Sequence, residues 1–391
     1  MAKRRREEAQ SNPQLRSAAS EFNRRILRKI QNALSADPEI DLLSVFPMQY
    51  SARLSTMLTQ KPAGAREDTT VSEPNVTDEK STEFEKGIVD TTSLDEIASV
   101  VFPLSDSVQE ILEISTSVEQ CPRHTARAIH NLTKRSPTIW QSQACRKHAV
   151  FRCNNNVIVK VVPDLKDYTE YTSMQYLWEH APDIPAPRPL GLVDLNATSY
   201  IFMSFVPGLT LDKVWPMLTQ ERKISLGDQL NDLLLDLKKL QRPDWMPLGG
   251  VGGEGCKDTR RQVRICKESL TTAAEFEDFL FSDPHFGGPV YIAFLRRFLS
   301  SREAAIIFSH GDLRPENIIV QPSDDVGYTI SGILDWEKSG FYPDYFECIK
   351  ATSNMSTSET DDWYMYLPMC ASPATYHAAW LVDRLWDSHV A

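Results

Sequence analysis

Near its C-terminal end the chain reads FSHGDLRPENIIV from Phe308 to Val320, and GILDWEKSG follows from Gly332 to Gly340. The first stretch places a histidine, an aspartate and an asparagine between apolar flanks. Burying such polar groups costs free energy unless hydrogen bonds or ions satisfy them. The stretch is therefore either a satisfied structural turn or a site that holds metal and phosphate, and the rest of the sequence must distinguish these two interpretations.

The length and composition are those of a folded chain without basic character. A chain of 391 residues is long enough for two domains or for one large two-lobed domain. Apolar residues make up 41% and charged residues 24%, which is typical of a soluble globular protein. The net charge of -11 and the pI near 5.3 argue against a nucleic-acid binder, because such a protein needs a basic face.

Cysteine usage and hydropathy indicate a cytoplasmic protein. The seven cysteines include no CxxC pair and no His/Cys cluster at zinc spacing, and an odd count is simplest in a reduced compartment. No apolar run approaches the roughly 18–20 residues that span a bilayer. The N-terminal MAKRRREEAQ is basic but lacks the apolar core of a signal peptide. We therefore expect a cytoplasmic location and no membrane span.

The first 92 residues carry no recognisable chemistry. Phe22, Ile26 and Ile30 recur at helical spacing, which predicts an N-terminal helical extension over residues 1–60. Residues 61–92 are rich in Thr, Ser, Glu and Asp and nearly free of large apolar side chains. Such a segment cannot offset its ordering entropy, so a disordered linker is predicted there. The extension is expected to dock on the main body or on a protein partner.

Residues 93–206 change from helical to strand patterning. SLDEIASVVF (Ser93–Phe102) and SDSVQEILEIS (Ser105–Ser115) begin with helix-start signals, which predict two short helices. Strands are predicted from residue 136 to residue 206, since HAVFRC alternates and VIVKVV is rich in β-branched residues. One helix, DYTEYTSMQYLWEHA (Asp167–Ala181), interrupts these strands. The segment is therefore predicted to hold helices and a β-rich lobe.

Residues 207–391 are mostly helical in pattern and contain the opening motifs, with NIIV and YTISGILDW as predicted strands. The glycine run LGGVGGEGC, residues 248–256, follows PDWMP instead of a strand and opens no clear helix. It is therefore interpreted as a loop of the helical lobe and not as a phosphate cradle. The expected fold class is α+β, with a small antiparallel β-rich N-terminal lobe and a larger helical C-terminal lobe.

The polar residues of the opening motifs have the composition of a phosphoryl-transfer site. Such a site needs oxygen ligands for a cation, a carboxylate that orients the acceptor hydroxyl, and a lysine that neutralises phosphate charge. Asp312 and Asn317 stand in one turn, and Asp335 ends an apolar strand. A β-hairpin that joins NIIV to GILDW would bring Asn317 and Asp335 together at the same end of the hairpin.

Taken together, HGDLRPENIIV and GILDWEKSGFYPDYFE resemble the aminoglycoside phosphotransferase and choline kinase-like family, in the form common in fungi. The resemblance covers roughly residues 135–380 and implies a two-lobed protein-kinase-like fold with ATP and Mg²⁺ in the cleft. It implies that Asp312 is the catalytic aspartate, that Asn317 and Asp335 are magnesium ligands, and that His310 braces the turn.

The same resemblance implies nucleotide-binding residues upstream. Lys160 lies inside VIVKVV and Glu170 follows on the next helix, so the two are expected to pair beside the α- and β-phosphates. YIFMSFVPG resembles the hinge between the lobes, where backbone groups of Met203, Ser204 and Phe205 would bind adenine. The loop expected over the phosphates, QSQACRKHA, has no glycine, and no A-P-E segment follows DWE. These departures favour a small-molecule kinase over a protein kinase.

We therefore expect an ATP- and Mg-dependent phosphotransferase that moves the γ-phosphoryl group to a hydroxyl of a small molecule. The acceptor is open: an aminoglycoside, choline, a homoserine-like metabolite or another hydroxylated compound suits the motifs. The acids and aromatics of ETDDWYMYL (Glu359–Leu367) would suit a cationic acceptor, although a solvated helix start with a core stripe explains them as well. Two alternatives stay open, a non-catalytic pseudokinase that binds ATP as a scaffold and a protein Ser/Thr kinase.

Overall fold

The computed structural model describes residues 18–37, 40, 97–114, 122–142, 148–259, 264–282, 284, 287–299 and 304–389. The chain divides into two compact units, Met1–Ser81 and Thr82–Ala391. In the first unit, helix α2 (Ala18–Ala36) lies within the predicted extension, and its Phe22 and Ile26 side chains are buried. The predicted linker over residues 61–92 lies outside the described residues.

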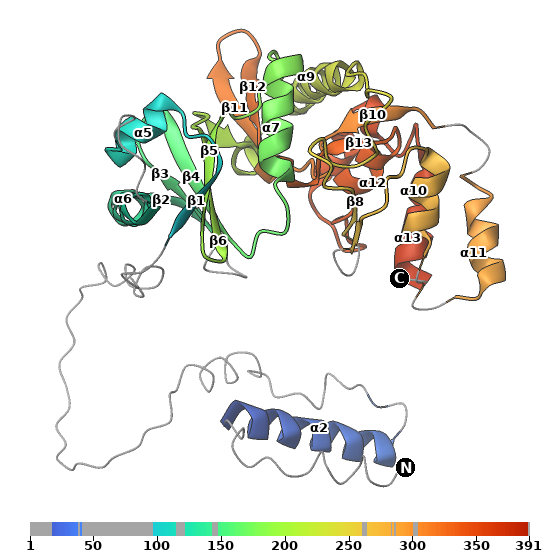
Figure 1. Ribbon diagram of the computed structural model, residues 1–391. Helices are drawn as coiled ribbons and strands as arrows, with labels where there is room; N and C mark the ends of the chain where they lie inside the picture. The colour runs from blue at the N-terminus through green and yellow to red at the C-terminus, as the bar shows by residue number, and fades with distance from the viewer. Residues whose placement is uncertain are drawn as a thin grey trace, which may run out of the picture. The chain divides into compact units, whose positions relative to one another are not determined.

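The described part of the second unit begins with a six-stranded antiparallel sheet in the order β1-β5-β6-β4-β3-β2. Its strands are β1 (Ala98–Phe102), β2 (Thr138–Gln141), β3 (Ala149–Arg152), β4 (Val157–Pro163), β5 (Pro189–Leu195) and β6 (Thr198–Ser204). Helices α5 (Asp106–Leu112) and α6 (Pro122–Arg135) pack on one face, and α7 (Thr169–His180) packs on the other (Figure 1). We call this sheet with its three helices the N-terminal lobe.

Strand β1 corrects one prediction. The helix predicted over Ser93–Phe102 is wrong for its described part, whereas the next predicted helix is present as α5. The strand ends in VVF, whose β-branched and aromatic side chains favour strands. It pairs with β5, with Val100 opposite Val193. The pairing with β5 therefore overrides the local helix-start signals, because intrinsic propensity takes no account of tertiary contacts.

Alternation along β4 decides which of its side chains faces the cleft. Val157, Val159 and Val161 are buried in one cluster with residues of α5 and α6. Because successive side chains of a strand point to opposite faces, Lys160 stands on the face that α7 covers. The first turn of α7 contains Glu170. The β-branched run thus anchors the strand in the core and presents its lysine to the helix.

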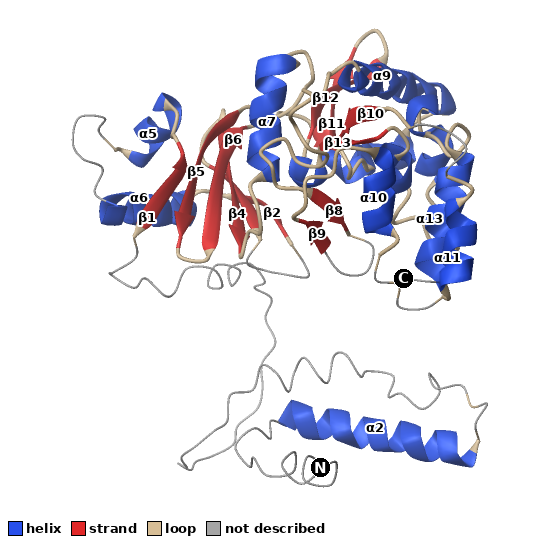
Figure 2. Ribbon diagram, turned by 45° about the vertical axis from the view of Figure 1, so that its right-hand side comes forward, coloured by secondary structure: helices blue, strands red, loops and turns tan. Residues whose placement is uncertain are grey.

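The C-terminal lobe is built mainly of helices around short strands (Figure 2). Its α-helices are α8 (Leu211–Val214), α9 (Gln220–Lys238), α10 (Ala273–Leu280), α11 (Pro289–Arg296), α12 (Phe346–Ala351) and α13 (His377–His389). Short 3₁₀ turns are η3 (Trp215–Met217), η4 (Pro315–Asn317), η5 (Trp336–Lys338), η6 (Asp362–Tyr366) and η7 (Met369–Ala371). The strands are β7 (Leu209–Thr210), β8 (Cys256–Asp258), β9 (Arg264–Cys266), β10 (Ile306–Ser309), β11 (Ile318–Ser323), β12 (Gly327–Ile333) and β13 (Gly340–Pro343).

One buried cluster joins the two lobes. Ile201 and Met203 of β6 belong to the same cluster as Ile318, Ile333 and Trp336 of the C-terminal lobe. The expected two-lobed α+β fold, with a small antiparallel lobe and a larger helical lobe, is confirmed. Within the described ranges, no helix has the length and apolar character that crossing a membrane requires.

Strands β11 and β12 form the predicted hairpin. Ile318 pairs with Ile333 at its open end. The next residue along, Leu334, donates its N–H to the carbonyl oxygen of Asn317 at 2.8 Å. Asn317 and Asp335 therefore lie at the same end of the hairpin, as the sequence predicts.

Candidate active site

Three predicted site residues meet where the lobes join. The Lys160 ammonium donates to both carboxylate oxygens of Glu170, at 2.9 and 2.8 Å, and to Oδ1 of Asp335 at 2.6 Å. Lys160 comes from β4, Glu170 from α7 and Asp335 from the turn after β12. The three side chains are 18%, 7% and 22% exposed, so water screens these ion pairs only weakly.

Opposed effects set the charges of this cluster. Burial alone would lower the pKa of Lys160, but the carboxylates of Glu170 and Asp335 hold it above its ordinary value. Burial alone would raise the pKa of Asp335, but its ion pair with Lys160 lowers that pKa to about 2. Burial raises the pKa of Glu170 to about 7, although Lys160 acts in the opposite direction. The Lys160 ammonium thus stands between two carboxylates that both stabilise its charge.

A group of carboxylates surrounds Asp335. Asp312, Asp335 and Glu337 each offer an oxygen within 4.8 Å of the others. Burial, and then the charge of Asp335, raise the pKa of the Glu337 carboxyl. Crowded carboxylates in a partly buried site are stabilised by a cation, and hard cations such as Mg²⁺ prefer oxygen ligands. This donor set therefore fits Mg²⁺.

The backbone conformation of Asp335 sets the direction of its side chain. Its φ of 68° and ψ of 59° are left-handed, which costs a non-glycine residue about 1–2 kcal/mol. Aspartate tolerates this region better than most residues because its short side chain bonds locally. The strained residue begins η5 and turns the chain directly after β12. Such strain often marks functional sites.

Asn317 lies beside Asp312 in the turn before β11. Its Nδ2 donates to the main-chain oxygen of Asp312 at 2.9 Å and lies 3.5 Å from Oδ2 of the same residue. The amide nitrogen therefore braces the turn. The ligand role predicted for Asn317 requires the other amide atom, Oδ1.

His310 holds the same turn to the end of β12. Its Nε2 lies 2.9 Å from the Leu334 oxygen, and the N–H of Asp312 donates to its Nδ1 at 3.2 Å. This pattern requires the ring proton on Nε2. The ring also meets the Trp336 ring edge-on, with centroids 4.5 Å apart. His310 thus fixes the backbone of Asp312 relative to that of Asp335.

Glu347 of α12 supports the backbone of the same turn. Its Oε2 accepts the N–H groups of His310 at 2.7 Å and Gly311 at 3.1 Å. Gly311 has a φ of 78°, and a Cβ there would lie 2.5 Å from the carbonyl oxygen of Lys338. Glycine therefore allows the two loops to approach each other. Glu347 ends the motif GFYPDYFE, which resembles a packing motif of the family, but its bonds to the turn were not predicted.

Two cations near Asp312 were missed by the sequence analysis. The Lys338 ammonium lies 3.0 Å from Oδ1 of Asp312. The Arg314 guanidinium lies 3.9 Å from Oδ2 of Asp312 and 3.9 Å from Oδ2 of Asp335. The position of Arg314 in the HGDLRPEN turn was an available signal. Lys338 lies three residues after Asp335 in GILDWEKSG, but its approach to Asp312 depends on the 3₁₀ turn η5.

The predicted adenine contacts lie at the end of β6. Met203 is buried and pairs with Ile158 and Pro189 of the neighbouring strands. The N–H of Ser204 donates to the Arg188 oxygen at 2.9 Å, and the N–H of Phe205 donates to the Asn156 oxygen at 2.8 Å. Any adenine contact here would therefore depend on carbonyl oxygens or on residues further along the chain. In the loop expected over the phosphates, residues 143–147 lie outside the described residues.

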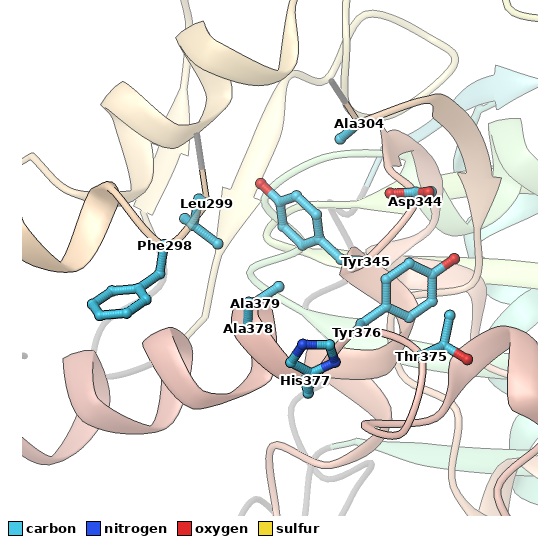
Figure 3. Close-up of a pocket in the computed structure, with 10 residues that line it drawn as sticks. All are labelled: Phe298, Leu299, Ala304, Asp344, Tyr345, Thr375, Tyr376, His377, Ala378 and Ala379. Carbon is cyan, nitrogen blue, oxygen red and sulfur yellow. The ribbon is translucent and has the colours of Figure 1, made fainter. Parts of the chain in front are cut away.

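A separate cavity of about 170 Å³ lies in the C-terminal lobe (Figure 3). Its lining includes Tyr345 and Tyr376 but none of the predicted site residues. The Tyr345 hydroxyl donates to Oε1 of Glu277 at 3.1 Å, and that of Tyr376 accepts from Lys238 at 3.1 Å. Because both hydroxyls are already engaged, we do not assign this cavity to the reaction.

The fold and the Lys160 cluster define a two-lobed kinase-like protein. Residues 153–368 match the model of the phosphotransferase enzyme family, and this match covers more than half of the chain. The protein belongs to this family, which confirms the resemblance seen in its motifs. None of the curated proteins compared with the chain matches it.

Solved structures with a similar arrangement include aminoglycoside phosphotransferases. One is APH(3'')-Id from Streptomyces rimosus, with 19% identity, 67% of this chain and 85% of that chain covered, and a TM-score of 0.35. Another is APH(2")-IIa in a ternary complex with streptomycin and ATP, with 12% identity, 67% and 86% covered, and a TM-score of 0.44. A third is ADP-bound APH(2'')-Ib, with 14% identity, 66% and 88% covered, and a TM-score of 0.40.

Proposed function

We propose that this protein is an ATP- and Mg²⁺-dependent phosphotransferase that transfers the γ-phosphoryl group to a hydroxyl of a small molecule. The observation that carries the proposal is the convergence of Lys160, Glu170 and Asp335, which lie on three elements and two lobes. A structural ion pair needs two partners. Here a buried ammonium is shared between a helix glutamate and an aspartate of the carboxylate group, an arrangement that suits phosphates and a metal.

Each side chain has a distinct proposed role. Lys160, positioned by Glu170, binds the α- and β-phosphates. Asp335 holds Mg²⁺ together with Asn317 or Glu337, and the bound ion would neutralise charge on the phosphate oxygens. Carbonyl oxygens of the stretch from Met203 to Phe205 are the proposed adenine contacts.

Asp312 is the proposed catalytic residue. Its carboxylate orients the acceptor hydroxyl toward the γ-phosphorus. As the bond from the acceptor oxygen to phosphorus forms, the bond to the oxygen that bridges the β- and γ-phosphates breaks, and the hydroxyl proton passes to Asp312. Lys338 is proposed to contact the transferring phosphoryl group, because its ammonium lies 3.0 Å from Oδ1 of the proposed catalytic carboxylate.

The acidic surroundings of the catalytic turn favour a cationic acceptor. Burial, and then the charges of Glu359, Glu316 and Asp361, raise the pKa of Tyr364. Glu316 belongs to the HGDLRPEN turn that carries Asp312, and Glu359 and Asp361 act on the same tyrosine. Asp362 does not contribute, because Lys223 binds both of its oxygens at 2.7 Å. We therefore propose a hydroxylated acceptor that also carries an amine or quaternary ammonium group.

The proposal is tested by ATP turnover with panels of hydroxylated acceptors, including aminoglycosides, choline and neutral polyols. We expect Mg²⁺-dependent formation of ADP and a phosphorylated small molecule, with cationic acceptors preferred. Binding of Mg-ATP without transfer to any hydroxyl would instead support the pseudokinase alternative. Phosphorylation of protein substrates alone would support the protein kinase alternative.

Replacing Lys338 with methionine is expected to lower kcat about 100-fold, because the transferring phosphoryl group loses one preorganised cation. Affinity for ATP should change little, since Lys160 remains. The measurements are kcat and KM for ATP at saturating acceptor. Lys239→Met, which removes an exposed lysine paired with Asp236 at 2.6 Å, is the control and should behave as wild type. A kcat for Lys338→Met within threefold of wild type would contradict the role.

A further inference from the structure

We propose that Lys257 is a positioning residue that fixes the first turn of α7 to the loop carrying Asp335. The role rests on the function proposed above, because these two elements supply both partners of Lys160. Lys257 lies in β8 and is 7% exposed. No motif in the sequence predicts a function for Lys257.

Three oxygens surround the Lys257 ammonium. It donates to Oδ1 of Asp167 at 2.8 Å, to Oγ1 of Thr169 at 2.8 Å and to the main-chain oxygen of Glu337 at 2.6 Å. An ammonium has three donors, so all of them are used. A buried charge is tolerated only when it is paired and hydrogen-bonded, and this one meets both conditions.

Each acceptor adjoins a residue of the active site. Asp167 also accepts the N–H of Thr169 at 3.0 Å and so closes the first turn of α7. Thr169 directly precedes Glu170, which pairs with Lys160. Glu337 lies in η5, the turn that Asp335 begins. Lys257 therefore ties the helix that carries Glu170 to the turn that carries Asp335.

The glycine-rich segment before Lys257 makes a second connection to α7. Oε1 of Glu254 accepts the Thr172 hydroxyl at 2.6 Å, and Oε2 of the same residue accepts the N–H of Gly252 at 2.8 Å. Gly249 exchanges two backbone hydrogen bonds with Phe341 of β13, at 2.8 and 2.9 Å. The run expected to be a loop of the helical lobe thus lies against both β13 and α7.

Close backbone contacts explain the glycines of this segment. A Cβ on Gly249 would lie 2.2 Å from the carbonyl oxygen of Gly255, and a Cβ on Gly255 would lie 2.1 Å from that of Cys266. Both residues have positive φ, at 99° and 81°. Glycine thus permits a compact turn that delivers Glu254 and Lys257 to α7. This packing, not phosphate binding, accounts for the run.

Loss of this connection should reduce the fraction of molecules in which Glu170 is in position to pair with Lys160. Apparent affinity for a ligand falls in proportion to the fraction of binding-competent molecules. Lys257→Met should therefore raise the KM for ATP about tenfold and lower kcat at saturating ATP much less. A residue with a merely structural role would reduce the amount of folded enzyme without this separation of KM from kcat.

The direct test is amide hydrogen exchange on the full-length protein without ligand. In Lys257→Met we expect exchange about tenfold faster in α7 and in residues 335–339, and unchanged exchange in α9, because local opening becomes easier. Lys238→Met is the matched control: this lysine donates to the Cys370 oxygen at 2.7 Å and to Tyr376. The control should leave exchange in α7 as in wild type.

Thr169→Val gives an independent test if Lys257→Met does not fold. It removes one acceptor without leaving an unpaired charge, and it should accelerate exchange in the same two segments by a smaller factor. Unchanged exchange in α7 in the folded variants would overturn the proposal. If wild type binds no ATP but Lys257→Met still accelerates exchange, the phosphotransferase assignment fails while the connection stands. If wild type turns over ATP normally but Lys257→Met leaves exchange unchanged, the phosphotransferase assignment stands and the proposed connection fails.

Discussion

Asp312→Asn is expected to lower kcat by about 10³-fold while leaving the fold and ATP affinity nearly intact. General-base groups that act in the transition state contribute about 10²–10⁴-fold. The asparagine preserves the shape of the side chain, and the brace from Asn317 to the Asp312 main-chain oxygen is retained. What is lost is the carboxylate that receives the hydroxyl proton. Steady-state kinetics with the best acceptor, together with ATP binding by calorimetry, measure the two effects separately.

Asp194→Asn is the matched control for this variant. Asp194 accepts hydrogen bonds from the hydroxyls of Tyr168 at 2.8 Å and Ser199 at 2.6 Å, within the N-terminal lobe. Its replacement should cost stability but leave kcat as in wild type. A kcat of Asp312→Asn within threefold of wild type would remove Asp312 from the mechanism. A loss of ATP binding as large as the loss of turnover would assign it to the metal site instead.

The positions of Asn317, Asp335 and Lys160 follow from short-range features of the strands that carry them. Asn317 and Asp335 could be placed at one mouth because a hairpin joins the strands beside them, and its ends follow from local pattern alone. The resemblance implied the pairing of Lys160 with Glu170, and alternation along β4, with its fixed period of two, explains why the lysine stands on the face that α7 covers. In both cases a short-range rule fixes where the side chain points.

The missed residues depend on contacts that no local pattern encodes. Lys338 reaches Asp312 only because Asp335 is left-handed and a 3₁₀ turn follows it. Lys257 reaches α7 because the glycine-rich segment packs against β13. Its three acceptors lie 80 to 90 positions away from it in sequence. The local pattern of β1 predicts a helix, whereas its strand conformation depends on pairing with β5, far along the chain. Tertiary contacts decide such positions.

The identity of the second metal ligand can be tested directly. The resemblance implies Asn317 as the partner of Asp335, and the structure also brings carboxylate oxygens of Asp312 and Glu337 within 4.8 Å of one of Asp335. Asp335→Asn should lower kcat more than about 10³-fold, because a metal supplies several kcal/mol of charge stabilisation. Wild type treated with a chelator should be inactive and should recover fully when Mg²⁺ is added back.

Glu337→Gln and Asn317→Ala then distinguish the second ligand. The variant that removes a true ligand should raise the Mg²⁺ concentration for half-maximal rate at least tenfold, and saturating Mg²⁺ should restore much of its rate. Glu337→Gln keeps the main-chain oxygen that accepts from Lys257, so an effect on Mg²⁺ would report the carboxylate itself. Asn317→Ala also removes the brace on Asp312, so it should lower kcat even at saturating Mg²⁺. If neither variant shifts the Mg²⁺ midpoint, Asp335 holds the ion without either partner, and the carboxylate group around it serves to balance Lys160 and Lys338.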